Sequence, residues 1–432
     1  MRTLVIGAGI SGRAAARLAG NLGDDVMVFD RRPEAVADLA GAFPTAAGTW
    51  SADLLARIDR VVVSPGVPEH APEIRDALAA GIPVISEIEL AASVTTATIV
   101  AVTGTNGKTT VTALIADMLA GAGCKAVATG NIGTAFADVA TEQWEVAVVE
   151  VSSFQLRFID GFHPRVAVLL NIAEDHLDWH GTLAAYAAAK SNIFRNQDTK
   201  DLLIYDIDDP GASAAVAGAR SRLFPVSGMS LPEGGAGPSG STLTVGSRAV
   251  ALGGIRDPSY VVDLAAAAVA ALEVGGTVDA VASVVAGFHP GPHRRTVVGQ
   301  WGGVTWVDDS KATNPHAALA ATGAYPSVVL IAGGRNKGLD LAPLAAAETV
   351  KHIVAIGESR HDLVAASRDP EQVTAVDSLD EAVATARSVA RPGDTVLLAP
   401  GCASFDMFSS YGDRGDAFAE AARRQNETAD GR

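Results

Sequence analysis

The sequence predicts an α/β protein of three domains with mostly parallel sheets, on three observations. First, short apolar runs such as residues 3–7, 98–104 and 328–334 alternate with alanine-rich helical stretches along the chain. This pattern is typical of parallel strands covered by helices on both faces. Second, two glycine-rich turns, at residues 7–12 and 104–107, each follow an apolar run and precede a helical stretch. Third, the 432 residues exceed what one hydrophobic core usually supports.

Three segments can be separated along the chain. A first domain is expected at residues 1–93, a central domain at 94–296 and a C-terminal domain at 297–432. The second boundary follows residues 287–296, which are rich in Gly, Pro and His and read as a linker. Within the central domain, the Gly/Pro/Ser-rich residues 227–242 are expected to form a flexible excursion.

Composition and charge exclude several classes of protein. The formal net charge of −16 disfavours nucleic-acid binding, which would need a basic surface. Cys124 and Cys402 are not spaced like metal ligands and indicate reduced thiols inside the cell. The apolar N-terminus breaks at Gly7 and predicts a strand, not a signal peptide. No apolar run approaches the ~20 residues of a membrane span, and residues 264–272 predict a packed helix, so a cytoplasmic protein is expected.

The first glycine-rich turn, GAGISG at residues 7–12, is close to a dinucleotide-binding fingerprint. The next strand ends in Asp30, eighteen residues after Gly12, about where such a fingerprint places an acidic residue. A glycine-rich turn at a helix N-terminus binds phosphates of many kinds, however, so the occupant stays open between NAD(P) and other nucleotides. Arg31 and Arg32 follow directly and could suit an extra phosphate or a nucleotide edge.

The second turn predicts a phosphate-binding loop, or P-loop. TGTNGKTT at residues 103–110 follows an apolar strand and opens a helix, although Val102 stands where the strict pattern has a glycine. In such a loop backbone N–H groups surround phosphate oxygens, Lys108 adds positive charge and the Thr109 hydroxyl offers a ligand to Mg²⁺. The expected nucleotide-binding residues are Gly104, Thr105, Asn106, Gly107, Lys108, Thr109 and Thr110.

Three further residues are candidate ligands or catalysts, and each has an ordinary alternative. Glu150 ends an apolar strand, where a carboxylate can cap a helix or pair with a lysine, but beside a P-loop strand it favours Mg²⁺ binding. His176 lies among acidic residues and is either a ligand or solvated. Lys190 follows three alanines, a pattern typical of a surface lysine on a helix.

Motifs spread over nearly the whole chain carry a resemblance to a known family. They are GNIG (130–133), EVSSFQL (150–156), NIAEDHLDWHG (171–181), YAAAKSNIF (186–194), PHRR (292–295), DSKATNP (309–315), GGRNKG (333–338) and CASFDMF (402–408). This series resembles the muramyl ligase family, with DSKATNP and CASFDMF as its most discriminating parts. The phosphate loop of that family reads TGTNGK[ST], so Val102 is a family trait.

The resemblance implies an activity and a task for each domain. The first, Rossmann-like domain would bind the UDP part of a substrate, the central P-loop domain would bind ATP, and the C-terminal domain, also Rossmann-like, would bind the incoming amino acid. The resemblance is greatest to the D-glutamate-adding branch, which joins D-glutamate to UDP-N-acetylmuramoyl-L-alanine through an acyl phosphate in peptidoglycan precursor synthesis. It also implies a monomer, two Mg²⁺ ions and a lysine carbamylated by CO₂, here Lys190.

The same resemblance implies roles for individual residues. The UDP pocket would be lined by Ser11, Asp30, Arg32, Ser64 and Gly66. The sugar–alanine part would meet Asn131, Ser152, Ser153 and Gln155. The catalytic residues would be Lys108, Glu150, His176, Lys190 and Lys311, and the metal ligands Thr109, Glu150, His176 and carbamylated Lys190. Arg294 and Asp309 would contact ATP, while Thr313, Lys337, Ser404 and Tyr411 would hold D-glutamate.

Departures from the family pattern leave specific points open. Residues 256–263, RDPSYVVD, replace a G-x-H-N-x-x-N segment that contacts the adenine side of ATP in many relatives, and Tyr411 stands where a phenylalanine is frequent. His180 and Arg414 have no matching role. The alternatives are a sister ligase that adds another amino acid, an NAD-dependent dehydrogenase built on GAGISG, and a P-loop protein without catalysis.

Overall fold

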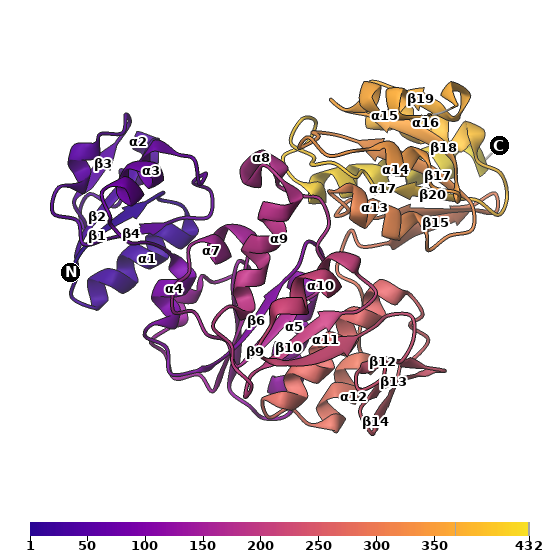
Figure 1. The fold of residues 1–432 in the computed structure, drawn as a ribbon. Coiled ribbons are helices and arrows are strands. Elements are labelled where there is room, and N and C mark those ends of the chain that lie inside the picture. The colour runs from indigo at the N-terminus through magenta and orange to yellow at the C-terminus, as the bar shows by residue number, and fades with distance from the viewer. Residues whose placement is uncertain (368, 431–432) are drawn as a thin grey trace. The chain divides into compact units, whose positions relative to one another are not determined.

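The computed structural model describes residues 1–367 and 369–430, and over these residues the strands form three sheets (Figure 1). Helices alternate with mostly parallel strands in each of them, which confirms the predicted α/β class. The first compact unit comprises Met1–Ile172 and Trp179–Gly287, and the second comprises Ala173–Asp178 and Phe288–Arg432. None of the described helices combines the length and apolar character that a membrane crossing requires.

The N-terminal sheet has the strand order of a nucleotide-binding fold. Its strands run in the order β3-β2-β1-β4-β5, and all are parallel. The order reverses between β1 and β4, which is where open sheets of this kind bind ligands. The strands are β1 (Arg2–Ile6), β2 (Asp25–Asp30), β3 (Thr45–Ala47), β4 (Arg60–Val63) and β5 (Val84–Ser86), and the helices are α1 (Ile10–Asn21), α2 (Pro33–Val36), α3 (Pro72–Ala79) and α4 (Glu87–Ala92).

The second sheet carries the P-loop between its strand β6 and helix α5. Its order is β14-β13-β12-β11-β10-β9-β6-β8-β7, parallel from β7 to β12 and antiparallel from β12 to β14. The strands are β6 (Thr98–Thr103), β7 (Ala126–Gly130), β8 (Val146–Glu150), β9 (Val166–Leu169), β10 (Leu202–Asp206), β11 (Arg222–Val226), β12 (Ala236–Ser239), β13 (Thr242–Val245) and β14 (Arg248–Ala251). Residues 227–242 therefore contain strand structure, so the prediction of a flexible excursion is wrong.

Helices cover this sheet, and two of them frame the P-loop. Figure 1 shows β6, β9 and β10 side by side, with α5 and α11 against them. The predicted packed helix at 264–272 is confirmed, because it lies in α11 and is buried over most of its length. The helices are α5 (Lys108–Gly121), α6 (Phe136–Val139), α7 (Ser153–Arg157), α8 (Leu177–His180), α9 (Leu183–Ser191), α10 (Pro210–Ala215), α11 (Pro258–Glu273) and α12 (Val278–Ala286).

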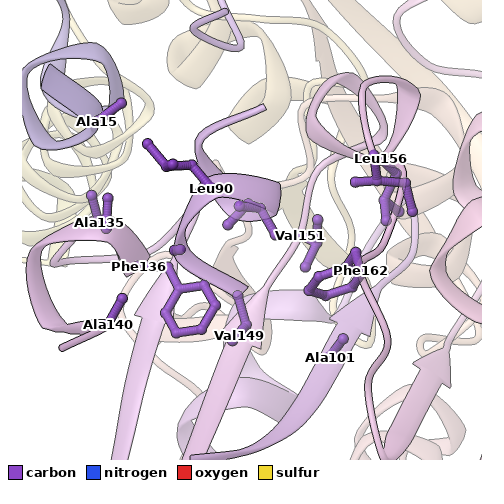
Figure 2. Close-up of a cluster of buried hydrophobic side chains, with 14 of the residues drawn as sticks. Ala15, Leu90, Ala101, Ala135, Phe136, Ala140, Val149, Val151, Leu156 and Phe162 are labelled. Carbon is purple, nitrogen blue, oxygen red and sulfur yellow. The ribbon is translucent and has the colours of Figure 1, made fainter. Parts of the chain in front are cut away.

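One apolar core joins the first two sheets. It includes Ala15 of α1 and Leu90 of α4 from the N-terminal sheet together with Phe136 of α6 and Val151 after β8 (Figure 2). Because these residues are buried against one another, the N-terminal sheet and the P-loop sheet belong to a single packed unit.

The third sheet lies between two apolar clusters. Its order is β15-β16-β20-β17-β18-β19, parallel except for β15. Along β17, Leu330 belongs to one cluster, whereas Val329 and Ile331 belong to the other, as the period of two in a strand requires. The strands are β15 (Thr296–Trp301), β16 (Val304–Asp308), β17 (Val328–Gly333), β18 (Val350–Ile356), β19 (Val373–Ala375) and β20 (Thr395–Leu398), and the helices are α13 (Pro315–Thr322), α14 (Ala342–Ala345), α15 (Arg360–Ala366), α16 (Leu379–Val389) and α17 (Tyr411–Asp430).

Candidate active site

The P-loop is a tight turn that two glycines make possible. Gly107 has a φ of +86°, and a Cβ atom there would lie 2.6 Å from Asp263 Oδ1 and 2.9 Å from Leu170 Cδ1. A Cβ on Gly104 would lie 2.9 Å from the Cβ of Leu170. Since a side chain at either position would collide with a neighbouring strand end or with α11, the loop can approach a ligand only with glycine here.

The segment after β9 holds the loop in shape. Asn171 accepts a hydrogen bond of 2.7 Å from the Asn106 N–H on its side-chain oxygen. Its backbone oxygen accepts one of 2.8 Å from the Thr105 N–H. The Thr105 hydroxyl lies 3.2 Å from the hydroxyl of Tyr186, on α9. These bonds preorganise the loop from two other elements of the same unit.

Two lysines converge on one carbonyl of the loop. Lys108 Nζ donates to the Gly104 oxygen at 2.9 Å, and Lys190 Nζ donates to the same oxygen at 2.7 Å. Lys190 is buried, with 1% of its surface exposed, and its Nζ lies 4.5 Å from the centre of the Tyr186 ring. The surface alternative for Lys190 is therefore wrong, because the structure places it beneath the phosphate loop.

Glu150 is joined to the first turn of α5. Its carboxylate accepts a hydrogen bond of 2.8 Å from the Thr109 hydroxyl and one of 3.0 Å from the Asn131 side-chain amide. A carboxylate and a hydroxyl oxygen side by side at a P-loop are ligands that Mg²⁺ prefers. The helix-cap and lysine-pair alternatives for Glu150 do not account for these contacts.

The loop after β8 is held by hydrogen bonds between side chains at the N-terminus of helix α7. Ser152 accepts a bond of 3.3 Å from the Gln155 N–H, and the Gln155 side-chain oxygen accepts from the Ser152 N–H and hydroxyl at 2.9 and 2.8 Å. This is the capping box of α7. The Ser153 hydroxyl lies 2.9 Å from His180 Nε2, and the His180 ring stacks on Phe154. The structure thus places His180, for which no role was predicted, beside this loop.

In the N-terminal sheet, Asp30 and Ser64 shape the GAGISG turn. Asp30 accepts from the N–H groups of Ala8 and Arg32 at 2.8 and 2.9 Å, and the Ser64 hydroxyl donates to the Gly7 oxygen at 2.8 Å. Burial alone would raise the pKa of Asp30, but these donors and the Arg32 side chain outweigh it and leave the pKa below its ordinary value.

The two arginines after Asp30 differ in their availability. Arg31 makes a two-pronged ion pair with the buried Glu73, at 2.6 and 2.9 Å, so its guanidinium is committed. Arg32 is exposed and lies 3.4 Å from Asp30, so it remains accessible to a ligand. Ser11 is half-buried at the start of α1, and Gly66 is exposed after β4.

In the second unit, the DSKATNP segment surrounds a buried carboxyl. Burial raises the pKa of Asp309 to about 6, while Arg295 and Arg294 counteract this rise. The Arg295 N–H donates to Asp309 at 3.2 Å. Lys311 donates to the Tyr411 hydroxyl at 2.9 Å, and its Nζ lies 4.3 Å from the centre of that ring.

The residues predicted to hold an amino acid are spread over neighbouring loops of this unit. Lys337 Nζ donates to Asp175 Oδ1 at 3.0 Å, and the Asn314 amide donates to Asp175 Oδ2 at 3.3 Å. Thr313 is half-buried and Ser404 is buried. His176 has a φ of +54°, and its Nε2 lies 3.8 Å from Asp175 Oδ2.

Arg414 ties two of these loops together. It is 1% exposed, and its guanidinium donates to the Ser310 oxygen and hydroxyl at 2.8 and 2.9 Å and to the Cys402 oxygen at 3.1 Å. Burial lowers its pKa to about 10. This arginine, to which the sequence assigned no role, therefore holds the loop of Lys311 against the loop of Ser404.

Sequence models of three domains match most of the chain. They are described as "Mur ligase MurD-like, N-terminal domain" at residues 1–86, "Mur ligase middle domain" at 102–233 and "Mur ligase, glutamate ligase domain" at 293–402. The chain belongs to the Mur ligase family. The resemblance stated from the motifs is thereby confirmed.

Individual Mur ligases match along nearly their full length. The chain is 41% identical over 441 residues to a protein of Pelotomaculum thermopropionicum, covering 97% of this chain and 96% of the relative. It is 42% identical over 459 residues to one of Frankia casuarinae, covering 97% and 93%. Both are named UDP-N-acetylmuramoylalanine–D-glutamate ligase. Among solved structures, MurF of Acinetobacter baumannii has a TM-score of 0.61 at 16% identity, covering 97% of this chain and 93% of that one, which shows the shared fold.

Mur ligases are ATP-dependent enzymes that require Mg²⁺, and this chain has residues that fit both groups. The P-loop with Lys108 fits nucleotide phosphates, and Thr109 with Glu150 fits a metal that also bonds to a phosphate. Within the described residues no three His, Cys, Asp or Glu side chains are grouped to hold a metal by themselves.

Sequence motifs missed one residue that shapes the P-loop of this Mur ligase, Asp263. Asp263 lies against Gly107, although it belongs to the segment that departs from the family pattern. Asp257 and Pro258 of that segment instead begin α11, where Asp257 accepts a bond of 3.0 Å from the Ser259 N–H. The sequence offered one hint of this role: Asp263 is an acidic residue directly before the predicted packed helix, which is rich in alanine.

Proposed function

We propose that this Mur ligase joins D-glutamate to UDP-N-acetylmuramoyl-L-alanine, with ATP converted to ADP and phosphate. The observation that carries the proposal is a sequence identity of about 40%, over almost the whole chain, to relatives named UDP-N-acetylmuramoylalanine–D-glutamate ligase. The reaction fits the Mur ligase chemistry: the γ-phosphoryl group moves to the alanine carboxylate, the amine of D-glutamate attacks the resulting acyl phosphate, and phosphate leaves.

The P-loop unit would bind ATP and activate the carboxylate. Lys108 and the loop N–H groups would neutralise phosphate charge, and Thr109 and Glu150 would hold Mg²⁺, which when bound would stabilise the charge that develops during phosphoryl transfer. Asn131 keeps the Glu150 carboxylate oriented through its amide. Ser152 and Ser153, on the neighbouring loop, would meet the sugar–alanine part.

The N-terminal sheet would hold the UDP part. The reversal of strand order between β1 and β4 brings the GAGISG turn and the Ser64–Gly66 turn to one edge of the sheet. Asp30 supports the turn from behind, and exposed Arg32 offers a cation to the nucleotide. No nicotinamide is needed in this reading.

The second unit would bind D-glutamate and contribute residues that contact ATP. Lysine and hydroxyl donors suit the two carboxylates of D-glutamate, and Lys337, Thr313, Ser404 and Tyr411 are the proposed donors. Lys337 already pairs with the carboxylate of Asp175, so its side chain is able to bind a carboxylate. Lys311 would act as a catalytic residue, Arg294 would contact the ATP phosphates, and Asp309 would bind the ribose.

Two finer features complete the proposal. Lys190 would carry CO₂ as a carbamate, whose oxygens offer a ligand to a second Mg²⁺ ion together with His176. Lys190 is buried beneath the P-loop, and burial in general favours the neutral amine of a lysine, which is the form that attacks CO₂. We further propose that the enzyme is a cytoplasmic monomer.

Phosphate release from ATP tests the function directly. We expect release only when both UDP-N-acetylmuramoyl-L-alanine and D-glutamate are present. Release with L-glutamate or diaminopimelate instead of D-glutamate would assign the chain to a sister activity, and an absorbance change that requires nicotinamide would overturn the class of reaction.

A further inference from the structure

A buried glutamate lies at the junction of the N-terminal sheet and the P-loop sheet. Glu87 is the first residue of α4, directly after β5, and is 1% exposed. Its helix packs against α1 and α6. Figure 2 shows the apolar surroundings of this helix, with Leu90 among Ala15, Phe136 and Val151. A carboxylate in such a place is costly unless specific partners hold it.

One oxygen of Glu87 has a clear partner in the P-loop sheet. Oε1 accepts a hydrogen bond of 2.6 Å from the N–H of Ala137, in the first turn of α6. Burial raises the pKa of Glu87 to about 7, and Asp138 adds to this rise, while the Ala137 N–H, the Gln155 side chain and the Phe136 N–H counteract it. Asp138 is itself paired with Arg17 of α1 at 2.8 Å.

The other oxygen of Glu87 and the amide nitrogen of Gln155 complement each other. Glu87 Oε2 and Gln155 Nε2 are both buried, and each lacks a hydrogen-bond partner within the usual distance and angle. The Gln155 side chain also counteracts the rise in the pKa of Glu87, as a neighbouring donor does. Glu87 Oε2 is a buried acceptor without a partner, and Gln155 Nε2 is a buried donor without a partner. A hydrogen bond between the two would remove the cost of leaving both groups unpaired.

The opposite end of Gln155 fixes which way its amide points. Its side-chain oxygen accepts two bonds from Ser152, from the N–H and from the hydroxyl. The nitrogen is therefore directed away from Ser152, and only an acceptor can stand opposite it. Glu87 supplies this acceptor from an element of the N-terminal sheet.

We propose that Glu87 is a positioning residue for the UDP-substrate site. By holding Gln155, it fixes the Ser152–Gln155 loop against which the sugar–alanine part of the substrate binds, and it links that loop to the sheet that binds UDP. This role rests on the proposed function.

Glu87→Gln tests the requirement for an acceptor at this position. The new side chain keeps an oxygen for the Ala137 N–H but places an NH₂ group against Gln155 Nε2. We expect the KM for UDP-N-acetylmuramoyl-L-alanine to rise about 10-fold, because the variant leaves one buried donor without an acceptor. The KM for ATP should change less than about 2-fold. Glu89→Gln is the matched control, because Glu89 lies on the same helix but bonds to the N–H groups of residues 160–162. It should lower thermal stability without changing that KM.

The exchange of the two side chains supplies the decisive variant. In Glu87→Gln with Gln155→Glu, the oxygen at 155 still accepts from Ser152, and a donor at 87 again faces an acceptor at 155. We expect the double variant to recover at least half of the loss in KM, whereas Gln155→Glu alone places two carboxylates together. An unchanged KM in E87Q, or a double variant no better than either single one, would overturn the role. Inactivity of the unchanged chain would overturn the proposed function and this role together.

Discussion

The hydroxyl of Thr109 donates a hydrogen bond of 2.8 Å to the carboxylate of Glu150. Strand register brings the two together: β8 lies beside β6, and Glu150 pairs with Val102, just before the loop that ends in Lys108 and Thr109. A carboxylate at the end of one strand thus meets the hydroxyl that opens the helix after its neighbour. These two oxygen atoms suit Mg²⁺, which proteins usually bind through one or two side-chain oxygens together with oxygens of a substrate phosphate.

Glu150→Gln is expected to reduce phosphate release by at least about 100-fold. The proposed Mg²⁺ would lose its carboxylate ligand and would therefore stabilise less of the negative charge that develops during phosphoryl transfer. Stability should change little, since the amide can still accept from Asn131 and donate to Thr109. Steady-state phosphate release and a thermal melt measure the two effects. Glu145→Gln, at the exposed residue just before the same strand, is the control and should retain activity. Equal losses in both variants would contradict the metal role of Glu150.

Gly107→Ala is expected to abolish ATP binding by distorting the P-loop. The residue has a φ of +86°, and its new Cβ would lie 2.6 Å from Asp263 Oδ1. Gly123→Ala is the matched control, since Gly123 has a φ of +83° with open space around it. Both variants should lose about 1 kcal/mol of stability from the strained backbone. Only G107A should lose nucleotide affinity in calorimetric titration. ATP affinity that is equal in the two variants would show that the collision with Asp263 is relieved.

The sheets could be predicted from sequence because buried parallel strands leave a direct mark. Strands such as β8 and β17 are covered on both faces, so every residue is apolar until the carboxyl end, where Glu150 appears in β8. The same logic located α11 as a packed helix. The apolar pattern of neighbouring residues determines these strands and this helix, so they can be predicted without knowing which distant residues they contact.

The prediction for residues 227–242 failed because glycine has two uses. A Cβ on Gly228 would lie 2.0 Å from the Pro258 oxygen, and one on Gly237 would lie 2.3 Å from the Ser230 oxygen. These glycines allow close backbone packing next to β12 and do not indicate flexibility. Which use applies depends on a neighbour elsewhere in the chain, as Pro258 illustrates, and composition does not reveal it.

The candidate site was predictable where function fixes a motif and unpredictable where packing fixes a partner. Lys108, Thr109 and Glu150 follow from their motifs. Glu87 and Asp263 are single acidic residues whose importance depends on Gln155 and Gly107, 68 and 156 positions away along the chain. Such pairings arise from how helices and loops of distant segments pack together, as for Glu87 on α4, Gln155 on α7 and Asp263 on α11, and the sequence of apolar runs leaves this packing undetermined.

Lys190→Ala is expected to lower activity by at least about 100-fold, because the proposed carbamate provides a metal ligand. Short carboxylates such as acetate or formate should restore part of the activity, since they can enter the space left by the side chain and offer the same oxygens. Lys125→Ala, on the exposed side of the same unit, is the control and should need no rescue. Full activity of K190A without added carboxylate, or no rescue at any concentration, would contradict the carbamate.

Tyr411→Phe is expected to raise the KM for D-glutamate about 5- to 20-fold, the loss of one hydrogen bond to a charged group. The phenylalanine keeps the ring 4.3 Å from Lys311 Nζ but removes the hydroxyl that lies 2.9 Å from it. The KM for ATP should stay within about 2-fold. Tyr205→Phe, on β10 of the first unit, is the control for loss of a tyrosine hydroxyl elsewhere. A rise in both KM values of Y411F would indicate a general disturbance of the loop instead.

Asp206→Asn is expected to make stability less dependent on pH. Burial raises the pKa of Asp206 to about 7, and the neighbouring charges of Asp208 and Asp209 add to the rise. The folded protein therefore holds this proton more tightly than the unfolded chain, in which the pKa is near the ordinary 3.8. The stabilising contribution of the group is complete below the unfolded pKa and is lost as pH rises through about 7.

Urea unfolding of D206N and the unchanged protein at pH 5.5 and pH 8 measures this contribution. The free energy of unfolding of the unchanged protein should fall by ~2 kcal/mol more over this interval than that of the variant, because the variant has no proton to lose. Glu87 and Asp309 also have raised pKa values, but both are present in both proteins and cancel in the difference. Asp117→Asn, on the exposed face of α5, should keep the full slope. Parallel curves for D206N and the unchanged protein would mean that Asp206 is already ionised at pH 5.5, and that the hydrogen bonds from the backbone N–H groups of Asp208 and Asp209, which lower its pKa, outweigh its burial.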